Sequence, residues 1–194
     1  MLDKNLIVID VETSGTNPET ASVLQIGAVK LSKDMLIIDE PLLLNIAPYT
    51  NVWEKKAEEV HGIKFETAMQ YGLQVKDALE RLVYWITKPK DVYIAQWSCG
   101  FDTDMLKSAF RFIEMDYPFS YRAYDIASVA RVYLSSHGYS SRVGCFDAAK
   151  LLKIDTEGLL AHRADSDALV AAKCLQAVHH NVLEKTNNKL VENR

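Results

Sequence analysis

The 194-residue sequence has no apolar run as long as the roughly 18 residues that a membrane-spanning helix needs. Its start, MLDKNLIVID, lacks the charged beginning, the longer apolar stretch and the small-residue cleavage site of a signal peptide. Its cysteines, Cys99, Cys145 and Cys174, are odd in number, lie far apart and include no CxxC pair. They predict free thiols in a reducing compartment, and therefore a soluble cytoplasmic protein with no membrane partner.

The sequence also lacks an excess of basic residues, since 22 Lys and Arg against 26 Asp and Glu give a net charge of −4. Proteins that hold nucleic acid by charge alone are usually basic, so a non-specific electrostatic binder is not expected. A metal enzyme fits this balance, because bound cations offset the charge of carboxylate ligands. With no repeat or linker, the chain predicts a single domain over residues 1–185 and a polar tail, residues 186–194, that frays.

Hydrophobic patterning predicts strands that alternate with helices. The expected strands cover residues 5–10, 23–31, 35–45 and 91–96, with a turn at 32–34 and a further strand that enters a helix near Asp125. The expected helices cover residues 53–60, 65–71, 74–87, 101–112 and 145–154, with a last helix after His162. A meander of strands followed by mixed units indicates an α/β domain with a mixed sheet covered by helices.

The most informative stretch is NLIVIDVETSGT, residues 5–16, where Asp10 and Glu12 follow a buried apolar run. Residues two apart on a strand point to the same face, so both carboxylates would project from one side. Ionising both in a partly buried place is costly without a cation, and Mg²⁺ and Mn²⁺ prefer such oxygen ligands. In the alternative interpretation Asp10 only ends the strand and Glu12 lies in solvent, because short acidic pairs recur by chance.

A second segment, AQWSCGFDTDML at residues 95–106, offers two further carboxylates, Asp102 and Asp104, at the start of a predicted helix. We favour Asp102, because the apolar residues Phe101 and Leu106 beside it would anchor that turn. The alternative is that Asp102 only stabilises the helix N-terminus, where a negative charge is favourable.

Two more segments carry histidines. In LLAHRADSDALVAA, residues 159–172, His162 and Asp167 would be separated by about 140° on a continuous helix. If both face one site, His162 therefore lies in the loop before the helix and Asp167 lies on the helix; alternatively they are a surface histidine and an acid at a helix start. In EEVHGIKFE, residues 58–66, a glycine ends one helix and His61 is either incidental or part of a site.

In this order and at this spacing, the segments resemble the DEDDh family of 3′→5′ exonucleases, which includes the proofreading subunit of bacterial replicative DNA polymerase. The motifs that carry the resemblance are VIDVETSGT, LQIGAVKL, EEVHGIK, FDTDML, CFDAAKLLKI and AHRADSDAL. The resemblance implies a ribonuclease H-like fold, a mixed β-sheet flanked by α-helices. The carboxylates that it implies as ligands of two Mg²⁺ or Mn²⁺ ions are Asp10, Glu12, Asp102 and Asp167, and the implied general base is His162.

The activity that the resemblance implies is hydrolysis of phosphodiester bonds from the 3′ end, releasing nucleoside 5′-monophosphates. Two metals about 3.5–4 Å apart stabilise the attacking and leaving oxygens, and a histidine titrates near neutral pH. We favour single-stranded DNA as the substrate. An exoribonuclease or oligoribonuclease is the alternative, since RNA discrimination depends on contacts to the 2′-hydroxyl that no motif specifies. A catalytically silent nucleic-acid-binding module is the third hypothesis.

One departure from the family concerns substrate contacts. Where the family often has His-Asn ahead of Phe-Asp, this chain has Trp97 and Ser98. Trp97 would offer a stacking face for a terminal base, worth about 1–3 kcal/mol, or would be buried behind the strand. Thr13 and His61 are further candidates for contacting the terminal nucleotide, with surface roles as the alternative. No polymerase-binding extension is evident, so a free-standing nuclease of open oligomeric state is expected.

Overall fold

The structure is a computed structural model that describes residues 2–98, 100–139 and 142–192, the side chains of Pro89 and of residues 184–192 excepted. Cys99 lies outside the described residues, whereas Cys145 and Cys174 are free thiols as predicted. Over the described part of the chain, no helix is both long and apolar enough to cross a membrane.

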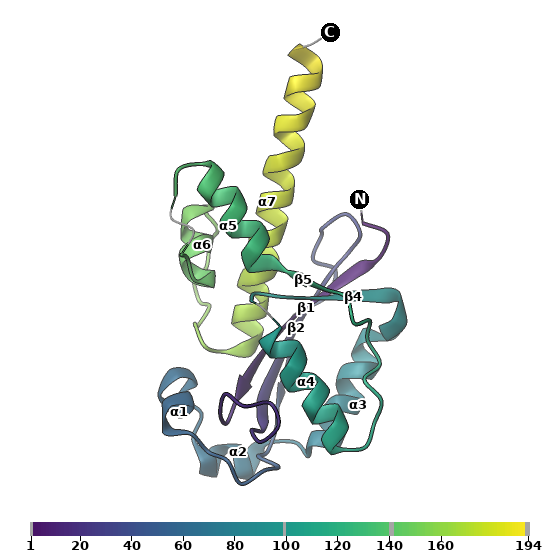
Figure 1. Cartoon of the computed structure of the whole chain (residues 1–194), viewed down its shortest axis with the longest axis vertical. Helices are drawn as coiled ribbons and strands as arrows, with labels where there is room; N and C mark the ends of the chain where they lie inside the picture. Colours follow the sequence, from purple (N-terminus) through teal and green to yellow (C-terminus); the bar gives the residue numbers. More distant parts are fainter. Residues whose placement is uncertain (1, 99, 140–141, 193–194) are drawn as a thin grey trace.

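A mixed β-sheet forms the centre of the molecule (Figure 1). In the described residues its strands are β1 (Asn5–Thr13), β2 (Val23–Leu31), β3 (Leu42–Asn45), β4 (Val92–Gln96) and β5 (Ala123–Asp125). Their order is β3-β2-β1-β4-β5; β1 pairs antiparallel with β2 and parallel with β4. The longest strands, β1 and β2, therefore lie side by side in the middle of the sheet.

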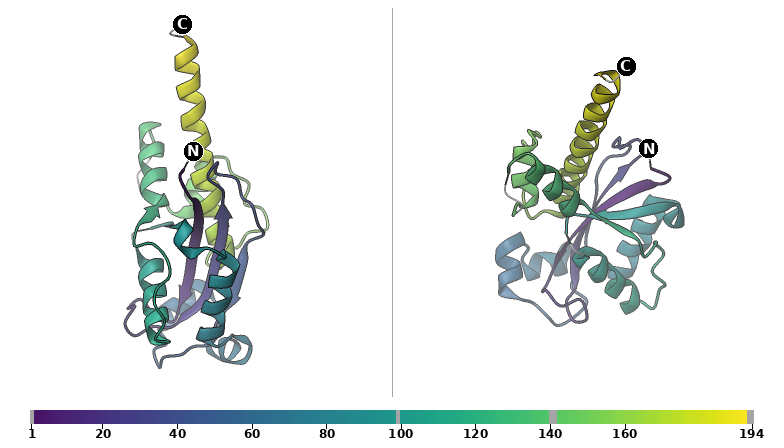
Figure 2. Two further views of the ribbon diagram at one scale, coloured as in Figure 1. Left: turned by 90° about the vertical axis from the view of Figure 1, so that its right-hand side faces the viewer. Right: turned by 45° about the horizontal axis from the view of Figure 1, so that its top comes forward.

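Helices cover both faces of the sheet (Figures 1 and 2). They are α1 (Lys55–His61), α2 (Phe65–Tyr71), α3 (Val75–Ile86), α4 (Phe101–Phe112), α5 (Ile126–Ser136), α6 (Cys145–Leu151) and α7 (Ala164–Glu192), with a 3₁₀ turn at Pro89–Asp91. Helices α3 and α4 pack on one face, where Leu82 and Phe110 are fully buried. Helix α7 packs on the other face through Ala168 and Ala172, and α5 and α6 pack against α7.

The side chains of β1 alternate between these two faces, as a two-residue period requires. Ile7 and Ile9 belong to the core beneath α3 and α4, whereas Leu6 and Val8 belong to the core beneath α7. Every second side chain along β1 points to the α7 face. Asp10 and Glu12 follow Val8 at this spacing, so their carboxylates are directed to the face on which α7 begins.

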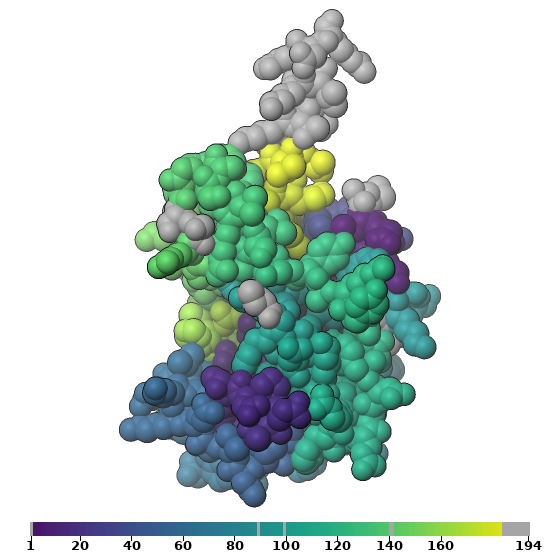
Figure 3. All heavy atoms as spheres, in the orientation of Figure 1, coloured from purple at the N-terminus to yellow at the C-terminus, as the bar shows by residue number. Residues whose placement is uncertain are grey.

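The segment after β1 lies on the surface between α1 and α4 (purple between blue and teal in Figure 3). The backbone N–H of Glu54 donates to the carbonyl of Ser14 at 2.7 Å, and Arg111 of α4 forms an ion pair with Glu19 at 2.9 Å. These contacts hold the segment against both neighbouring helices.

Two predicted strand boundaries are wrong. The strand expected at residues 35–45 is reduced to β3, because Met35 adopts a positive φ of 62° in a tight turn and residues 39–41 leave the sheet, so that only an isolated bridge at Ile37 precedes β3. Strand β1 continues three residues beyond Asp10, since its pairing with β2 persists to Thr13. Asp10 therefore lies within the strand rather than at its end.

Helix α7 begins after His162, as predicted, and its upper part projects beyond the rest of the molecule (Figure 1). The tail expected to fray from residue 186 is helical as far as Glu192. A helix that is already formed adds residues without a new nucleation cost, which explains the extension. The domain boundary at residue 185 stays a prediction.

Candidate active site

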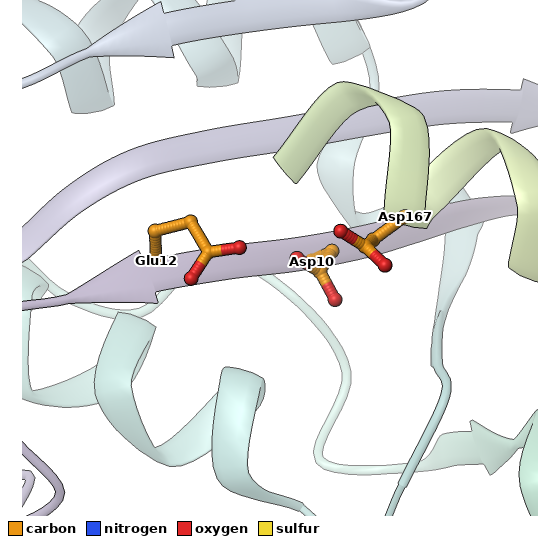
Figure 4. Close-up of side chains that lie close together, drawn as sticks. All are labelled: Asp10, Glu12 and Asp167. Carbon is orange, nitrogen blue, oxygen red and sulfur yellow. The ribbon is translucent and has the colours of Figure 1, made fainter. Parts of the chain in front are cut away.

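Asp10 and Glu12 of β1 and Asp167 of α7 form an acidic cluster (Figure 4). One carboxylate oxygen from each residue lies within 4.8 Å of the others. The two strand residues share a face because they are two apart, and Asp167 comes from the first turn of the helix that packs on that face. The structure thus brings together three of the four predicted carboxylates at ligand-like spacing.

Burial is the main factor that raises the pKa values of these carboxyl groups. Burial is the main cause for Asp10, whose pKa lies well above its ordinary range, and the charges of Asp102, Asp167 and Glu12 add to it. Burial, together with Asp167 and Asp102, raises the pKa of Glu12 to about 8. Buried like charges of this kind become favourable once a divalent cation is shared between them. The all-oxygen donor set therefore fits Mg²⁺ or Mn²⁺.

Asp102 stands beside the cluster and is tied to the backbone of β1. Its Oδ1 accepts a hydrogen bond from the N–H of Val11 at 3.0 Å. The pairing of β1 with β4 ends at Val8, which leaves room for this contact at the edge of β1. Asp102 is not among the three carboxylates within 4.8 Å of one another. Burial raises its pKa to about 6, although the Val11 N–H opposes the shift.

The position of Asp102 depends on the last residue of β4. Gln96 is buried, and its Oε1 accepts a hydrogen bond from the backbone N–H of Thr103 in the first turn of α4 at 3.0 Å. The first N–H groups of a helix have no partner inside the helix, so this bond both satisfies one and fixes the start of α4. The sequence did not single out Gln96.

His162 and Asp167 occupy the loop and the helix as predicted. His162 is exposed and has a positive φ of 61°, a conformation in which histidine is enriched among non-glycine residues. The Oδ2 of Asp167 accepts a hydrogen bond from the backbone N–H of Arg163 at 3.0 Å. This bond ties the acid to the turn that carries the histidine, so that the two side chains are presented together.

His61 and Thr13 are joined to each other at the end of β1. The Nδ1 of His61 accepts from the N–H of Ile63 at 3.0 Å, so Nε2 carries the proton and donates to the carbonyl of Thr13 at 3.1 Å. Burial lowers the pKa of His61, in keeping with this neutral form. Both residues anchor α1 to the strand, and neither is among the residues that line the pocket. Their contact with substrate stays a prediction.

A pocket of about 460 Å³ opens over the acidic cluster. The predicted site residues that line it are Asp10, Glu12, Trp97, Ser98, Asp102, His162 and Asp167. Lining residues that the sequence did not single out as site residues are Val11, Gly144, Cys145, Phe146, Asp147 and Ala161. Trp97 also packs against two hydrophobic cores. It therefore serves as a packing residue, the alternative stated above, and also lines the pocket.

Phe101 departs from its predicted role. It was expected to anchor the turn that carries Asp102, but it is 39% exposed and lines the pocket, whereas Leu106 is fully buried and does anchor the helix. The first residue of a helix has no preceding turn to cover it, which leaves the ring of Phe101 free to face outward. The sequence predicted the α6 residues of the pocket only as part of a helix. The signal available there was Gly144 directly before the helix, followed by Phe146 as its second residue.

The fold and the acidic pocket together define a nuclease of the exonuclease class. The family model described as exonuclease (RNase_T) matches residues 7–175, and the chain belongs to this family. The predictions of an enzyme, of a ribonuclease H-like sheet and of membership in the DEDDh exonucleases are confirmed.

Several known proteins are similar to the chain. The 3′-5′ DNA exonuclease Cap18 of Escherichia coli is 29% identical over 195 aligned residues that cover 96% of each chain. Ribonuclease T of Buchnera aphidicola is 35% identical over 86 residues, 42% of this chain and 40% of that protein. A solved structure of exonuclease I superposes with a TM-score of 0.75 at 20% identity, covering 90% of this chain but only 40% of its own. The last likeness concerns the fold alone.

Proposed function

We propose that the chain is a metal-dependent 3′→5′ exonuclease that hydrolyses DNA from the 3′ end and releases nucleoside 5′-monophosphates. The observation that carries the proposal is the acidic cluster of Asp10, Glu12 and Asp167 at a pocket that also holds His162. The choice of DNA is supported by the similarity to Cap18, which extends over 96% of both chains.

The residues present fit two divalent cations. Asp10, Glu12 and Asp167 offer the closest set of oxygens, and Asp102 offers a further carboxylate at the edge. Two such ions, when bound, stabilise the attacking and leaving oxygens of the phosphodiester. Mg²⁺ and Mn²⁺ are the ions that prefer these ligands.

His162 is the group available to accept the proton of the attacking water. It lines the pocket and is exposed to solvent, and histidine is the residue type that most often serves as a general base. The released proton can pass from the exposed ring to solvent. The hydrogen bond from the Arg163 N–H to Asp167 fixes this carboxylate relative to the turn that carries His162.

The aromatic side chains of the pocket would bind the terminal nucleotide. Phe101 presents a ring that is 39% exposed, and the half-buried Trp97 lies beside Ser98 in the lining. Aromatic rings accept any base on their faces, so these contacts position the 3′ end without reading sequence.

A 3′→5′ exoribonuclease is the second candidate. It is supported by the match to Ribonuclease T over 86 residues, a shorter alignment than that with Cap18. A silent binding module is disfavoured, because all five predicted catalytic positions line one pocket. A free-standing, cytoplasmic enzyme stays a prediction from the sequence.

The test is a paired digestion of 5′-labelled single-stranded DNA and RNA of the same sequence, with Mg²⁺, with Mn²⁺ and with EDTA. We expect a metal-dependent ladder that shortens from the 3′ end and is faster on DNA. The Asp102→Asn variant should lose it, whereas Asp104→Asn, an exposed neighbour on the same helix, should retain it. A faster RNA ladder would favour the second candidate, and no cleavage of either polymer would contradict both.

A further inference from the structure

The first turn of α7 touches β2 so closely that one residue of the strand has no room for a side chain. A Cβ added at Gly27 would lie 2.0 Å from the carbonyl carbon and oxygen of Ala164 and 2.3 Å from the nitrogen of Asp165. These are backbone atoms, which cannot rotate away. The φ of Gly27 lies outside the left-handed region, so the glycine is required by this contact and not by its backbone conformation.

Gly27 lies directly across from a predicted metal ligand. In the antiparallel pairing of β1 and β2 its partner is Asp10. Cross-strand partners share a face of the sheet, so Gly27 and Asp10 lie together beneath the start of α7. Asp167 follows Ala164 by about one helical turn. The separation of helix and strand at Gly27 therefore sets how near Asp167 comes to Asp10.

Gln25 supplies a second contact on the same face of β2. It lies two residues before Gly27 and pairs with Glu12 across the strands. Its Oε1 accepts a hydrogen bond from the backbone N–H of Ala164 at 3.4 Å, and its Nε2 donates to the Oδ1 of Asn45 on β3 at 2.8 Å. The sheet thus provides a partner for the first N–H of α7, a group with no acceptor within the helix.

We propose that Gly27 and Gln25 are positioning residues for metal binding. Gly27 permits, and Gln25 holds, the contact that brings Asp167 into ligand distance of Asp10 and Glu12. The inference rests on the proposed function, since it treats the acidic cluster as a metal site. A methyl group at position 27 would displace the first turn of α7 by about 1 Å before reaching even the closest tolerated contact. Metal–ligand distances tolerate only about 0.2 Å.

The experiment is a calorimetric titration of the full chain with Mn²⁺, without substrate, for the wild type, Gly27→Ala and Gly72→Ala. Gly72 is the matched control, because a Cβ there would lie 2.2 Å from the backbone nitrogen of Ala47, a similarly tight contact away from the pocket. We expect the Mn²⁺ dissociation constant to rise about 10- to 100-fold in Gly27→Ala, the range for residues that support metal ligands. Gly72→Ala should lose thermal stability and keep the wild-type affinity.

If Gly27→Ala does not fold, Gln25→Ala carries the test. It removes the acceptor of the Ala164 N–H without adding an atom, and should weaken Mn²⁺ binding several-fold. Gln176→Ala is its control, because Gln176 makes an α7 hydrogen bond, 2.7 Å to the carbonyl of Met35, away from the pocket.

Three outcomes would overturn the inference. Unchanged Mn²⁺ affinity in Gly27→Ala, or in Gln25→Ala where that variant carries the test, would show that the contact between β2 and the first turn of α7 does not position Asp167. Equal weakening in a test variant and its control would show general destabilisation. A wild type that binds no Mn²⁺ would contradict the proposed function itself, and so the two failures are distinguishable.

Discussion

The carboxylate of Asp102 accepts a hydrogen bond from the backbone N–H of Val11 across 3.0 Å, and it thereby joins the start of α4 to the strand between Asp10 and Glu12. The Asp102 side chain thus has two roles that substitutions can separate. One is to satisfy a buried N–H group, and the other is to add negative charge to the pocket.

Asp102→Asn should therefore abolish activity while preserving the fold, because its side-chain oxygen still accepts from Val11. Asp102→Ala should lose activity and also about 1–3 kcal/mol of stability, the cost of an unsatisfied buried donor. Digestion assays and denaturant unfolding of both variants measure the two effects. If the two variants unfold at the same denaturant concentration, the hydrogen bond has no structural role. Asp104→Asn, which removes an exposed ion pair with Lys107, should change neither quantity much.

The stability of the metal-free protein should fall as the pH rises. The pKa of Glu12 is raised from 4.5 to about 8 in the folded state, so folding favours its protonated form. This contribution is complete below about pH 4.5 and is lost as the pH rises toward 8. Asp10 and Asp102, also raised, act in the same direction.

A bound cation relieves the repulsion among the ionised carboxylates of the cluster, and more of them are ionised at high pH. Mg²⁺ or Mn²⁺ should therefore raise the melting temperature more at pH 8 than at pH 6. Thermal unfolding with metal and with EDTA at both pH values measures the difference. The Glu12→Gln variant should show a flatter pH dependence without metal. A metal effect of equal size at both pH values would contradict the electrostatic argument.

His162→Ala should reduce the single-turnover rate about 10²- to 10⁴-fold, the usual contribution of a general base. Mn²⁺ affinity should remain, because the carboxylates are intact. His162→Gly should be equally slow but more stable than His162→Ala, since a glycine adopts the observed φ of 61° without strain. Rapid-quench kinetics, calorimetry and thermal unfolding separate these effects, with His137→Ala, outside the pocket, as a control. A full rate in His162→Ala would remove His162 from the mechanism.

Trp97 and Phe101, two of the aromatic residues that line the pocket, should respond differently to truncation. Trp97→Ala should cost on the order of 3 kcal/mol of stability, because the ring packs against two cores. Phe101→Ala should leave stability nearly unchanged and raise the KM for DNA about 5- to 150-fold, the equivalent of one lost base stack. Unfolding curves and steady-state kinetics test both. Phe112→Ala, an exposed ring on the same helix, should leave KM unaffected.

Much of the site could be predicted from sequence because the relative directions of several site residues follow from their spacing within one short segment. The spacing of Asp10 and Glu12 places them on one face of any strand, and the separation of His162 and Asp167 excludes a shared helix face. Both inferences agree with the structure. They needed only the periods of a strand and a helix.

The remainder depends on contacts between distant segments. The hydrogen bond from the Val11 N–H to Asp102 exists because β1 continues beyond Val8, where its pairing with β4 ends. The sequence of neither strand alone shows where that pairing ends. Phe101 was assigned to the interior because it is apolar, yet its place at the first position of α4 turns it to the pocket. The close contact at Gly27 likewise joins residues 137 positions apart along the chain.

The surroundings of the pocket differ in how much sequence change they can accommodate. Next to the carboxylates, Gly27 has no space for a single added carbon. At the edge formed by the start of α6, a Cβ on Gly144 would meet, among the described residues, only the Oδ2 of Asp147, at an ordinary 3.8 Å. Evolvability is therefore expected to be uneven: laboratory libraries can vary the α6 edge to explore new substrate preferences, whereas the contact with α7 excludes a side chain at Gly27.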